Sequence, residues 1–355
     1  MTPPPQARLA TTVLRLLLDR RDAATPPRLP DVPWNDWVPV LQRNAVLLRV
    51  AERVEMRAWP VLATAVLDER ARVARMLQLM RHVACACEQH GIPHVFPKAL
   101  AHYPDAGSDV DLLVPVRPEA DPLILGDASV AAQGLGLAHL LAASRVYRPW
   151  DGGLALDIHH GRVGKLGEHR ELAATLIANR RRLTAEDLDW WVPAPEDALV
   201  LQGLDRVAGR RSFRLGDVVS TIRTVRAGLD WDAVLRTARA VNGLPSLACY
   251  LGYVSQIHRE ALGGELPLPP LGMPHTAGWG RADFRDGLVR FPAVRVSGSV
   301  YARAFGTAVA QGRWAGAVRL LLLPLLAAAA LWRRATHVVA AGAFLPTWAA
   351  LRSQR

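Results

Sequence analysis

A short strand-forming block between long helix-forming segments limits what this chain can fold into. The block covers about residues 91–165, and its strand candidates have the apolar and β-branched composition typical of strands. Asp151-Gly152-Gly153 separates the last two candidates and is a turn sequence of the kind that closes β-hairpins. The strand candidates are residues 92–96, 110–115, 144–150 and 154–163. This pattern predicts an α+β protein that is mostly helical and contains one small β-sheet.

Helix-type periodicity surrounds this block on both sides. Asn35 is the expected N-cap of one helix, Gly91 is expected to end another, and the Gly- and Pro-rich residues 263–300 are expected to form loops. The predicted helices cover residues 9–18, the segment after Asn35, 62–90, 127–144 and 168–262. The predicted parts are an N-terminal helical region (1–75), an α/β core (76–167), a helical domain (168–265) and a C-terminal extension of loops and apolar helices (266–355).

The formal net charge of +11 comes almost wholly from arginine. Of the 43 basic residues, only Lys98 and Lys165 are lysines, which leaves 41 arginines. Together with abundant Ala, Leu and Pro, this bias is typical of a GC-rich genome, so the charge is weak evidence for nucleic-acid binding. Half of the 355 residues are hydrophobic, which argues against a disordered chain and favours two or three folded units.

Cysteine content and the two ends of the chain bear on its compartment. Three scattered cysteines make neither a disulfide framework nor a zinc motif, and no secretory signal is visible, so we expect a cytoplasmic protein. Two apolar runs, residues 320–332 and 338–351, are each shorter than the roughly 20 residues of a membrane-spanning helix. Two interpretations stay open: buried helices that close the fold, or a hairpin over residues 315–351 at the inner face of the membrane.

Two carboxylates stand at the start of the strongest strand candidate. Because side chains alternate along a strand, Asp109 and Asp111 lie on one face and Val110 on the other. Neighbouring carboxylates repel each other unless a cation lies between them, and Mg²⁺ typically binds one or two carboxylates together with phosphate oxygens. The pair therefore predicts a site for a divalent metal.

A third carboxylate lies on the second strand of the predicted hairpin. Asp157 and His159 share one face of that strand, whereas Leu156, Ile158 and His160 share the other. If this strand lies beside the strand of Asp111, three carboxylates converge in an arrangement that suits two metals and a triphosphate. Neither histidine is assigned to the metal. Lys98, in the turn after residues 92–96, is a candidate contact for nucleotide phosphates.

The order of these motifs resembles a known family. In order, they are Gly91-Ile92-Pro93, Phe96-Pro97-Lys98-Ala99-Leu100, Tyr103-Pro104, Ser108-Asp109-Val110-Asp111-Leu112-Leu113-Val114, Leu156-Asp157-Ile158-His159 and, in the helical half, Pro195-Glu196-Asp197-Ala198-Leu199 and Leu229-Asp230-Trp231-Asp232. Over about residues 30–265 the chain resembles the bacterial "nucleotidyltransferase family protein" group of the DNA polymerase β-like nucleotidyltransferase superfamily.

The resemblance implies a mixed sheet with flanking helices and a metal-dependent transfer of NMP from an NTP, such as ATP, to a hydroxyl or phosphate of a small molecule or peptide. It implies that Asp109 and Asp111 hold Mg²⁺ or Mn²⁺. Asp157 would share a metal and assist deprotonation of the acceptor. Lys98, Ala99 and Ser108 would form the nucleotide-binding segment.

The sequence departs from the family pattern at two places. Ala99 stands where the family usually has glycine, and the segment between Tyr103-Pro104 and Asp109 lacks the arginine commonly found there. Two alternatives stay open: a transferase with a nucleotide-activated sugar or phosphate donor, and a non-catalytic nucleotide-binding scaffold with a partner- or membrane-binding C-terminus. Nucleic acid is an unlikely acceptor, since Arg180-Arg181-Arg182 and Arg210-Arg211 are expected to be solvated helix faces.

Overall fold

The computed structural model describes residues 5–18, 34–54, 60–126, 128, 130–132, 142–149, 153–164, 167–209, 212–271, 280–318 and 320–322. The chain divides into two compact units, Met1–Ala304 and Phe305–Arg355, and each is described by itself. The domain boundaries expected from sequence stay predictions, although the one at residue 75 falls inside a single continuous helix, α4 (Pro60–Gln89).

The first unit contains a four-stranded mixed sheet in the order β1-β4-β3-β2. Strands β1 and β4 are parallel, whereas β4 pairs antiparallel with β3, and β3 with β2. The strands are β1 (Asp109–Val114), β2 (Val130–Ala132), β3 (Ser144–Pro149) and β4 (Ala155–His160). The small mixed sheet and the α+β class predicted from sequence are therefore confirmed, as are the antiparallel pairing of β3 with β4 and, shifted by one residue, the strand expected at 110–115.

Burial explains why these two segments form neighbouring strands. In β1 every residue after Asp109 is buried, which is typical of a strand covered on both faces. In β4 burial alternates residue by residue, so that Leu156 and Ile158 are fully buried and the residues between them are half-buried. Asp157 and His159 therefore lie on one face of β4, and Leu156, Ile158 and His160 lie on the other.

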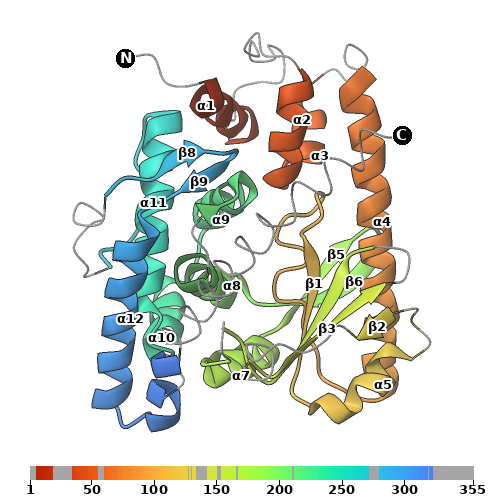
Figure 1. Cartoon of the computed structure of the whole chain (residues 1–355), viewed down its shortest axis with the longest axis vertical. Coiled ribbons are helices and arrows are strands. Elements are labelled where there is room, and N and C mark those ends of the chain that lie inside the picture. The colour runs from red at the N-terminus through yellow and green to blue at the C-terminus, as the bar shows by residue number, and fades with distance from the viewer. Residues whose placement is uncertain are drawn as a thin grey trace, which may run out of the picture. The chain divides into compact units, whose positions relative to one another are not determined.

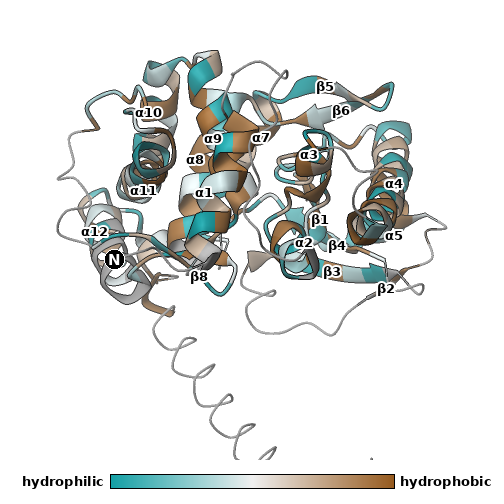
Figure 2. Ribbon diagram, turned by 90° about the horizontal axis from the view of Figure 1, so that it is seen from above, coloured by the Kyte–Doolittle hydropathy of each residue, from teal (hydrophilic) through white to brown (hydrophobic). Residues whose placement is uncertain are grey.

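Helices account for most of the remaining chain. In Figures 1 and 2, α4 runs alongside the sheet, and the group α8–α11 lies on the other side of β1 from α4. One continuous hydrophobic cluster joins residues of α1, α4, the sheet and α8–α11. The helices are α1 (Pro5–Leu18), α2 (Trp34–Arg43), α3 (Leu47–Ala51), α4, the 3₁₀ turn η2 (Pro118–Ala120), α5 (Asp121–Leu125), α7 (Arg170–Ala178), α8 (Pro195–Leu204), the π-helix η3 (Asp205–Gly209), α9 (Leu215–Ala227), α10 (Trp231–Ala240), α11 (Leu244–Leu262) and α12 (Ala293–Ala310).

The end of α4 agrees with the prediction from sequence, whereas the start of α2 does not. The helix expected at 62–90 is α4, and Gly91 follows its end with φ +63°, a conformation that glycine adopts at little cost. The helix expected to begin after an Asn35 N-cap instead begins at Trp34, so Asn35 lies within it.

Two further small sheets overturn other expectations from sequence. Strands β5 (Arg181–Ala185) and β6 (Leu188–Val192) form a hairpin inside the segment predicted to be helical, so Arg181 and Arg182 lie on a strand rather than a helix face. Its two turn residues, Glu186 and Asp187, both have positive φ, as type I′ hairpin turns require. These residues lack the Asn-Gly or Asp-Gly sequence that usually marks such a turn.

The segment 263–300, expected to form loops, contains strands as well. Strands β8 (Asp283–Arg285) and β9 (Leu288–Arg290) form a hairpin, and β9 also pairs with β7 (Ser212–Phe213). The turn is Asp286-Gly287, with φ +51° and +71°, so a usable hairpin signal was present in the sequence. The first helix residues of α12 also lie in this segment.

Two further expectations, both for segments next to the four-stranded sheet, were wrong. Residues 92–96 do not form a strand; Val95 makes one isolated bridge to Leu113. Residues 130–132, predicted to be helical, form the edge strand β2 because β3 offers them backbone hydrogen bonds. Residues 127, 129 and 133–141 of that predicted helix (127–144) lie outside the described residues, and its last residue, Ser144, begins β3.

Nearly all of the two apolar C-terminal runs lies outside the described residues, as does the Pro-rich linker at 25–30. Among the helices that are described, none is long and apolar enough to cross a bilayer.

Candidate functional site

The sheet brings two of the predicted carboxylates together. Asp111 on β1 and Asp157 on β4 are direct partners in the parallel ladder, so both side chains project from the same face of the sheet. Asp111 is 7% exposed and Asp157 is half-buried. From sequence, these two carboxylates were expected to converge only if their strands were neighbours. The structure shows that β1 and β4 are neighbours.

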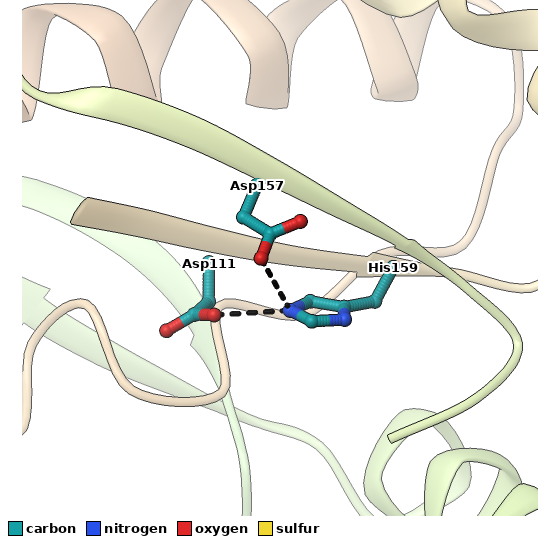
Figure 3. Close-up of side chains that lie close together, drawn as sticks. All are labelled: Asp111, Asp157 and His159. Carbon is teal, nitrogen blue, oxygen red and sulfur yellow. Dashed lines mark hydrogen bonds and ion pairs between the residues drawn. The ribbon is translucent and has the colours of Figure 1, made fainter. Parts of the chain in front are cut away.

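His159 completes this cluster, although its sequence pattern alone did not assign it to the metal. Its Nε2 lies 3.0 Å from Oδ1 of Asp111 and 3.5 Å from Oδ2 of Asp157 (Figure 3). Burial disfavours the charged ring, but the charges of Asp157 and Asp111 outweigh burial and raise the pKa of His159. An ionised carboxylate can only accept, so Nε2 carries a proton and donates it in the protein without metal. The alternation that placed His159 beside Asp157 on one face was the available signal.

These three side chains form a compact set of metal-ligand atoms. One ligand atom from each of Asp111, Asp157 and His159 lies within 4.8 Å of the others. Carboxylate oxygens and an imidazole nitrogen are donors that divalent cations bind in proteins. The donor set therefore fits a divalent metal, by the chemistry of its atoms and by their separation.

Asp109, the other predicted metal ligand, is not part of this compact set. It precedes Asp111 by two residues on the same strand face, and its Oδ1 accepts a hydrogen bond of 2.7 Å from Oγ of Ser108. Ser108, predicted to bind nucleotide, thus contacts a predicted metal ligand. That Asp109 binds metal and Ser108 binds nucleotide stays a prediction.

Lys98 extends from the turn that follows the Val95 bridge. Its Nζ lies 3.4 Å from Oδ1 of Asp205, the first residue of the π-helix η3. Lys98 also lies close enough to His159 for its charge to oppose protonation of that ring, which places the ammonium beside the carboxylate cluster. Asp205 was missed in the sequence analysis, since nothing local to residues 198–205 marks it as a partner of Lys98.

Ala99 contributes its backbone rather than its side chain to this turn. The side chain is 2% exposed and belongs to the hydrophobic core. Its φ is not in the left-handed region, where the described non-glycine residues are Ala45, Ala143, Glu186, Asp187, Asn242 and Asp286. The turn therefore forms without the glycine that the family usually has there.

A buried charge network anchors the Lys98 turn to the helices on one side. Arg206, next to Asp205, donates to Oδ1 of Asp217 at 2.8 Å, and Nε2 of His102 lies 3.2 Å from the same oxygen. Asp217 is fully buried, and despite that burial the charge of Arg206 and the His102 contact hold its pKa well below its usual range. Burial lowers the pKa of His102, so a neutral ring donates to Asp217.

The segment before β1 is anchored from the other side by α3 and α4. Asp105 accepts hydrogen bonds from the backbone N–H of Leu48 and of Arg49, at 2.8 and 3.4 Å. Burial raises the pKa of Asp105 to about 6, although those N–H groups and Arg49 act against it. Both Asp109 and Lys98 therefore stand at the ends of a turn that is held from two directions.

Helix α4 also supplies an arginine to this segment. Arg72 donates to the carbonyl oxygen of Gly107, and its partner Glu69 accepts from the backbone N–H of Ala106 at 2.9 Å. The segment itself lacks the arginine expected from the family pattern, but one reaches it from α4. Sequence spacing could not show this, since α4 is distant in the chain.

Comparison with protein-family models identifies the family of the chain. The model of the family described as "Uncharacterised nucleotidyltransferase" matches residues 30–258, which is more than half of the chain. The chain belongs to this family. The matched part of this nucleotidyltransferase-family chain contains β1, β4, Lys98 and the whole Asp111–Asp157–His159 cluster.

Other comparisons add little beyond the family. One solved structure similar to the chain is the "antigenic nucleotidyltransferase-like protein from Paracoccidioides brasiliensis", at 13% identity and a TM-score of 0.32. The similarity covers 54% of this chain and 94% of that one. No curated protein sequence matches the chain. Membership of the nucleotidyltransferase family indicates an enzyme that transfers nucleotidyl groups, and the family itself is uncharacterised.

Proposed function

We propose that this protein transfers NMP from an NTP to a hydroxyl or phosphate of a small molecule or peptide. The observation that carries the proposal is the register of β1 with β4, which places Asp111 opposite Asp157 on one face of the sheet. Their ligand oxygens lie within 4.8 Å of each other, which suits a divalent cation, and family membership supports nucleotidyl transfer as the reaction.

The proposed metal ligands are Asp111 and Asp157, with Asp109 joining them once its bond to Ser108 is exchanged. A divalent metal bound here would neutralise the charge of the triphosphate and polarise its α-phosphorus. In the transfer, the acceptor oxygen forms a bond to the α-phosphorus, its proton passes to a carboxylate, and pyrophosphate leaves.

The other residues orient the nucleotide and remove the proton. Asp157 is the proposed base, because it lies on β4 directly beside Asp111, where a metal-bound substrate would meet it. Lys98 is the proposed phosphate contact, and the phosphate would compete with Asp205 for its ammonium. Ser108 and the backbone of Ala99 border the same turn.

Labelling tests the proposal. The full chain is incubated with each NTP labelled at the α-phosphorus, Mg²⁺ or Mn²⁺, and an extract of the source cells. We expect a labelled product and released pyrophosphate, both lost in Asp111→Asn and Asp157→Asn. Asp68→Asn, an exposed acid on α4, is the matched control and should retain turnover. Turnover equal to wild type in both site variants would refute the proposal.

The mass added to the acceptor separates the remaining alternatives. Addition of an NMP supports the proposal, whereas addition of a sugar or a phosphate alone indicates the other donor class. Metal-dependent nucleotide binding without pyrophosphate release, over all NTPs, would indicate a non-catalytic scaffold.

We also propose a membrane or partner contact for the second unit, acting from the cytoplasm. Trp314, Val318 and Leu321 are 64%, 56% and 51% exposed, lie in the helical residues 314–318 and 320–322, and have the i, i+4, i+7 spacing typical of one face of a helix. Flotation of the full chain with anionic vesicles tests this, with Trp314→Ser as the weakened variant. Equal flotation of both proteins would contradict it.

A further inference from the structure

One nitrogen atom, Nε2 of His159, faces two carboxylate oxygens in the cluster. A metal site made of carboxylates alone, as expected from sequence, would contain no such nitrogen. Nε2 of His159 lies 3.0 Å from Oδ1 of Asp111 and 3.5 Å from Oδ2 of Asp157 (Figure 3). A single N–H cannot align with both acceptors at once. One ligand atom of each of the three residues lies within 4.8 Å of the others, close enough for a single cation to contact all three.

The distances between these atoms match those between ligands of a small divalent metal. With metal–ligand bonds of about 2.0–2.2 Å, neighbouring ligands are roughly 3 Å apart at right angles and roughly 3.4 Å apart in a tetrahedral arrangement. The two distances from Nε2, 3.0 and 3.5 Å, are close to these two values. Both side chains on β4 are half-buried between buried neighbours, so His159 is held in place by the strand.

We propose that His159 is a metal ligand, so that Asp111, Asp157 and His159 form a mixed oxygen and nitrogen site that prefers Mn²⁺ or a similar transition metal over Mg²⁺. Mg²⁺ takes oxygen ligands and keeps several waters, whereas imidazole is a good ligand for first-row transition metals. A metal among these atoms takes the place of the Nε2 proton. The inference rests on the proposed function only in the choice of this cluster as the reaction site.

The direct test detects nitrogen bound to Mn²⁺. The full chain, loaded with Mn²⁺ alone, is measured by pulsed electron paramagnetic resonance, in which a coordinated ¹⁴N modulates the spin echo. We expect this modulation in the wild type, its change to the ¹⁵N pattern in protein labelled with ¹⁵N-histidine, and its loss in His159→Leu. His90→Gln, which removes an exposed histidine on the chain after α4, is the control and should retain it.

Calorimetric titration gives an independent readout. Loss of even an outer partner of a ligand costs about 10–100-fold in metal affinity, so His159→Leu should weaken Mn²⁺ binding at least tenfold. Mg²⁺ binding, which depends on the carboxylates, should change much less. The isotope experiment needs no variant, so a missing ¹⁵N pattern overturns the inference even if His159→Leu does not fold, and His159→Gln is then the second variant that assigns the signal to this residue.

The outcomes separate this inference from the proposed function. Mn²⁺ that binds without coordinated nitrogen, modulation that persists in His159→Leu, or no Mn²⁺ binding at all would overturn the inference. Nitrogen coordination without NMP transfer would overturn the proposed function and leave the metal ligand in place. NMP transfer without coordinated nitrogen would do the reverse.

Discussion

Asp111 and Asp157 are direct partners across the parallel strands β1 and β4, and both carboxylates point toward Nε2 of His159. Two like charges in a half-buried position destabilise the fold unless a cation or a protonated group lies between them. In the structure that group is His159. The arrangement makes stability, as well as activity, depend on what occupies this position.

Metal binding should therefore stabilise the folded chain. At a metal concentration 100-fold above the dissociation constant, the free energy of unfolding should rise by about 2.7 kcal/mol. Thermal unfolding with and without Mn²⁺ measures this. The rise should be absent in Asp157→Asn and present in Asp68→Asn. An equal rise in both variants would show that the metal binds elsewhere.

Lys98 should contribute directly to the binding of the triphosphate. A hydrogen bond to a charged group is worth about 1.5–3 kcal/mol, so Lys98→Ala should weaken binding of a non-hydrolysable NTP by that amount. Calorimetry measures the affinity. Lys165→Ala, the other lysine, is the control and should bind like wild type. Unchanged affinity in Lys98→Ala would remove it from the site.

Asp217 should govern acid stability through the network that anchors the Lys98 turn. Its pKa lies below the usual 3.8 in the folded chain, so its contribution is complete above that pH and is lost as the pH falls further. Asp217→Asn should cost about 3–5 kcal/mol near neutral pH, because it removes the fully buried one of the two carboxylates that pair with Arg206 and leaves only the partly exposed Asp205.

The pH dependence of that cost identifies its cause. Below about pH 4 the difference between wild type and Asp217→Asn should shrink by about 1.4 kcal/mol per pH unit. Urea unfolding at several pH values measures it, with exposed Asp232→Asn as the control within about 0.5 kcal/mol of wild type. A cost that is constant down to acidic pH would mean that the carboxylate charge is not responsible.

Gly216 should tolerate no side chain, because it lets α9 approach the Lys98 turn. A Cβ there would lie 2.8 Å from the carbonyl oxygen of Asn44 and 3.0 Å from Nδ1 of His102. Gly216→Ala should destabilise the fold by about 1–3 kcal/mol through overpacking. The helical control Gly298→Ala, which meets nothing within 4 Å, should gain up to about 1 kcal/mol. Denaturant unfolding distinguishes the two signs.

The sequence of the two central strands already contained much of the site. Period-two alternation put Asp157 and His159 on one face of β4 and predicted the strand that begins with Asp109. The Asp286-Gly287 hairpin also had a recognisable turn sequence. Glu186-Asp187 is not a typical turn sequence, and its residues have positive φ because β5 pairs with β6.

Other features depended on contacts between distant segments. Asp205 meets Lys98, and Arg72 meets Gly107, because helices far away in the chain pack against the same turn. No local pattern specifies such partners, since helical periodicity says which face is buried but not against what.

For this protein, the sequence by itself determined the α+β class, the approximate positions of β1 and β4, and which side chains share a face, because these follow from local composition and backbone geometry. Only the tertiary structure decided that β1 lies in register beside β4, that His159 rather than Asp109 joins Asp111 and Asp157, and that Lys98 pairs with Asp205. Those outcomes depend on long-range pairing and packing, which optimise burial and charge over the whole fold.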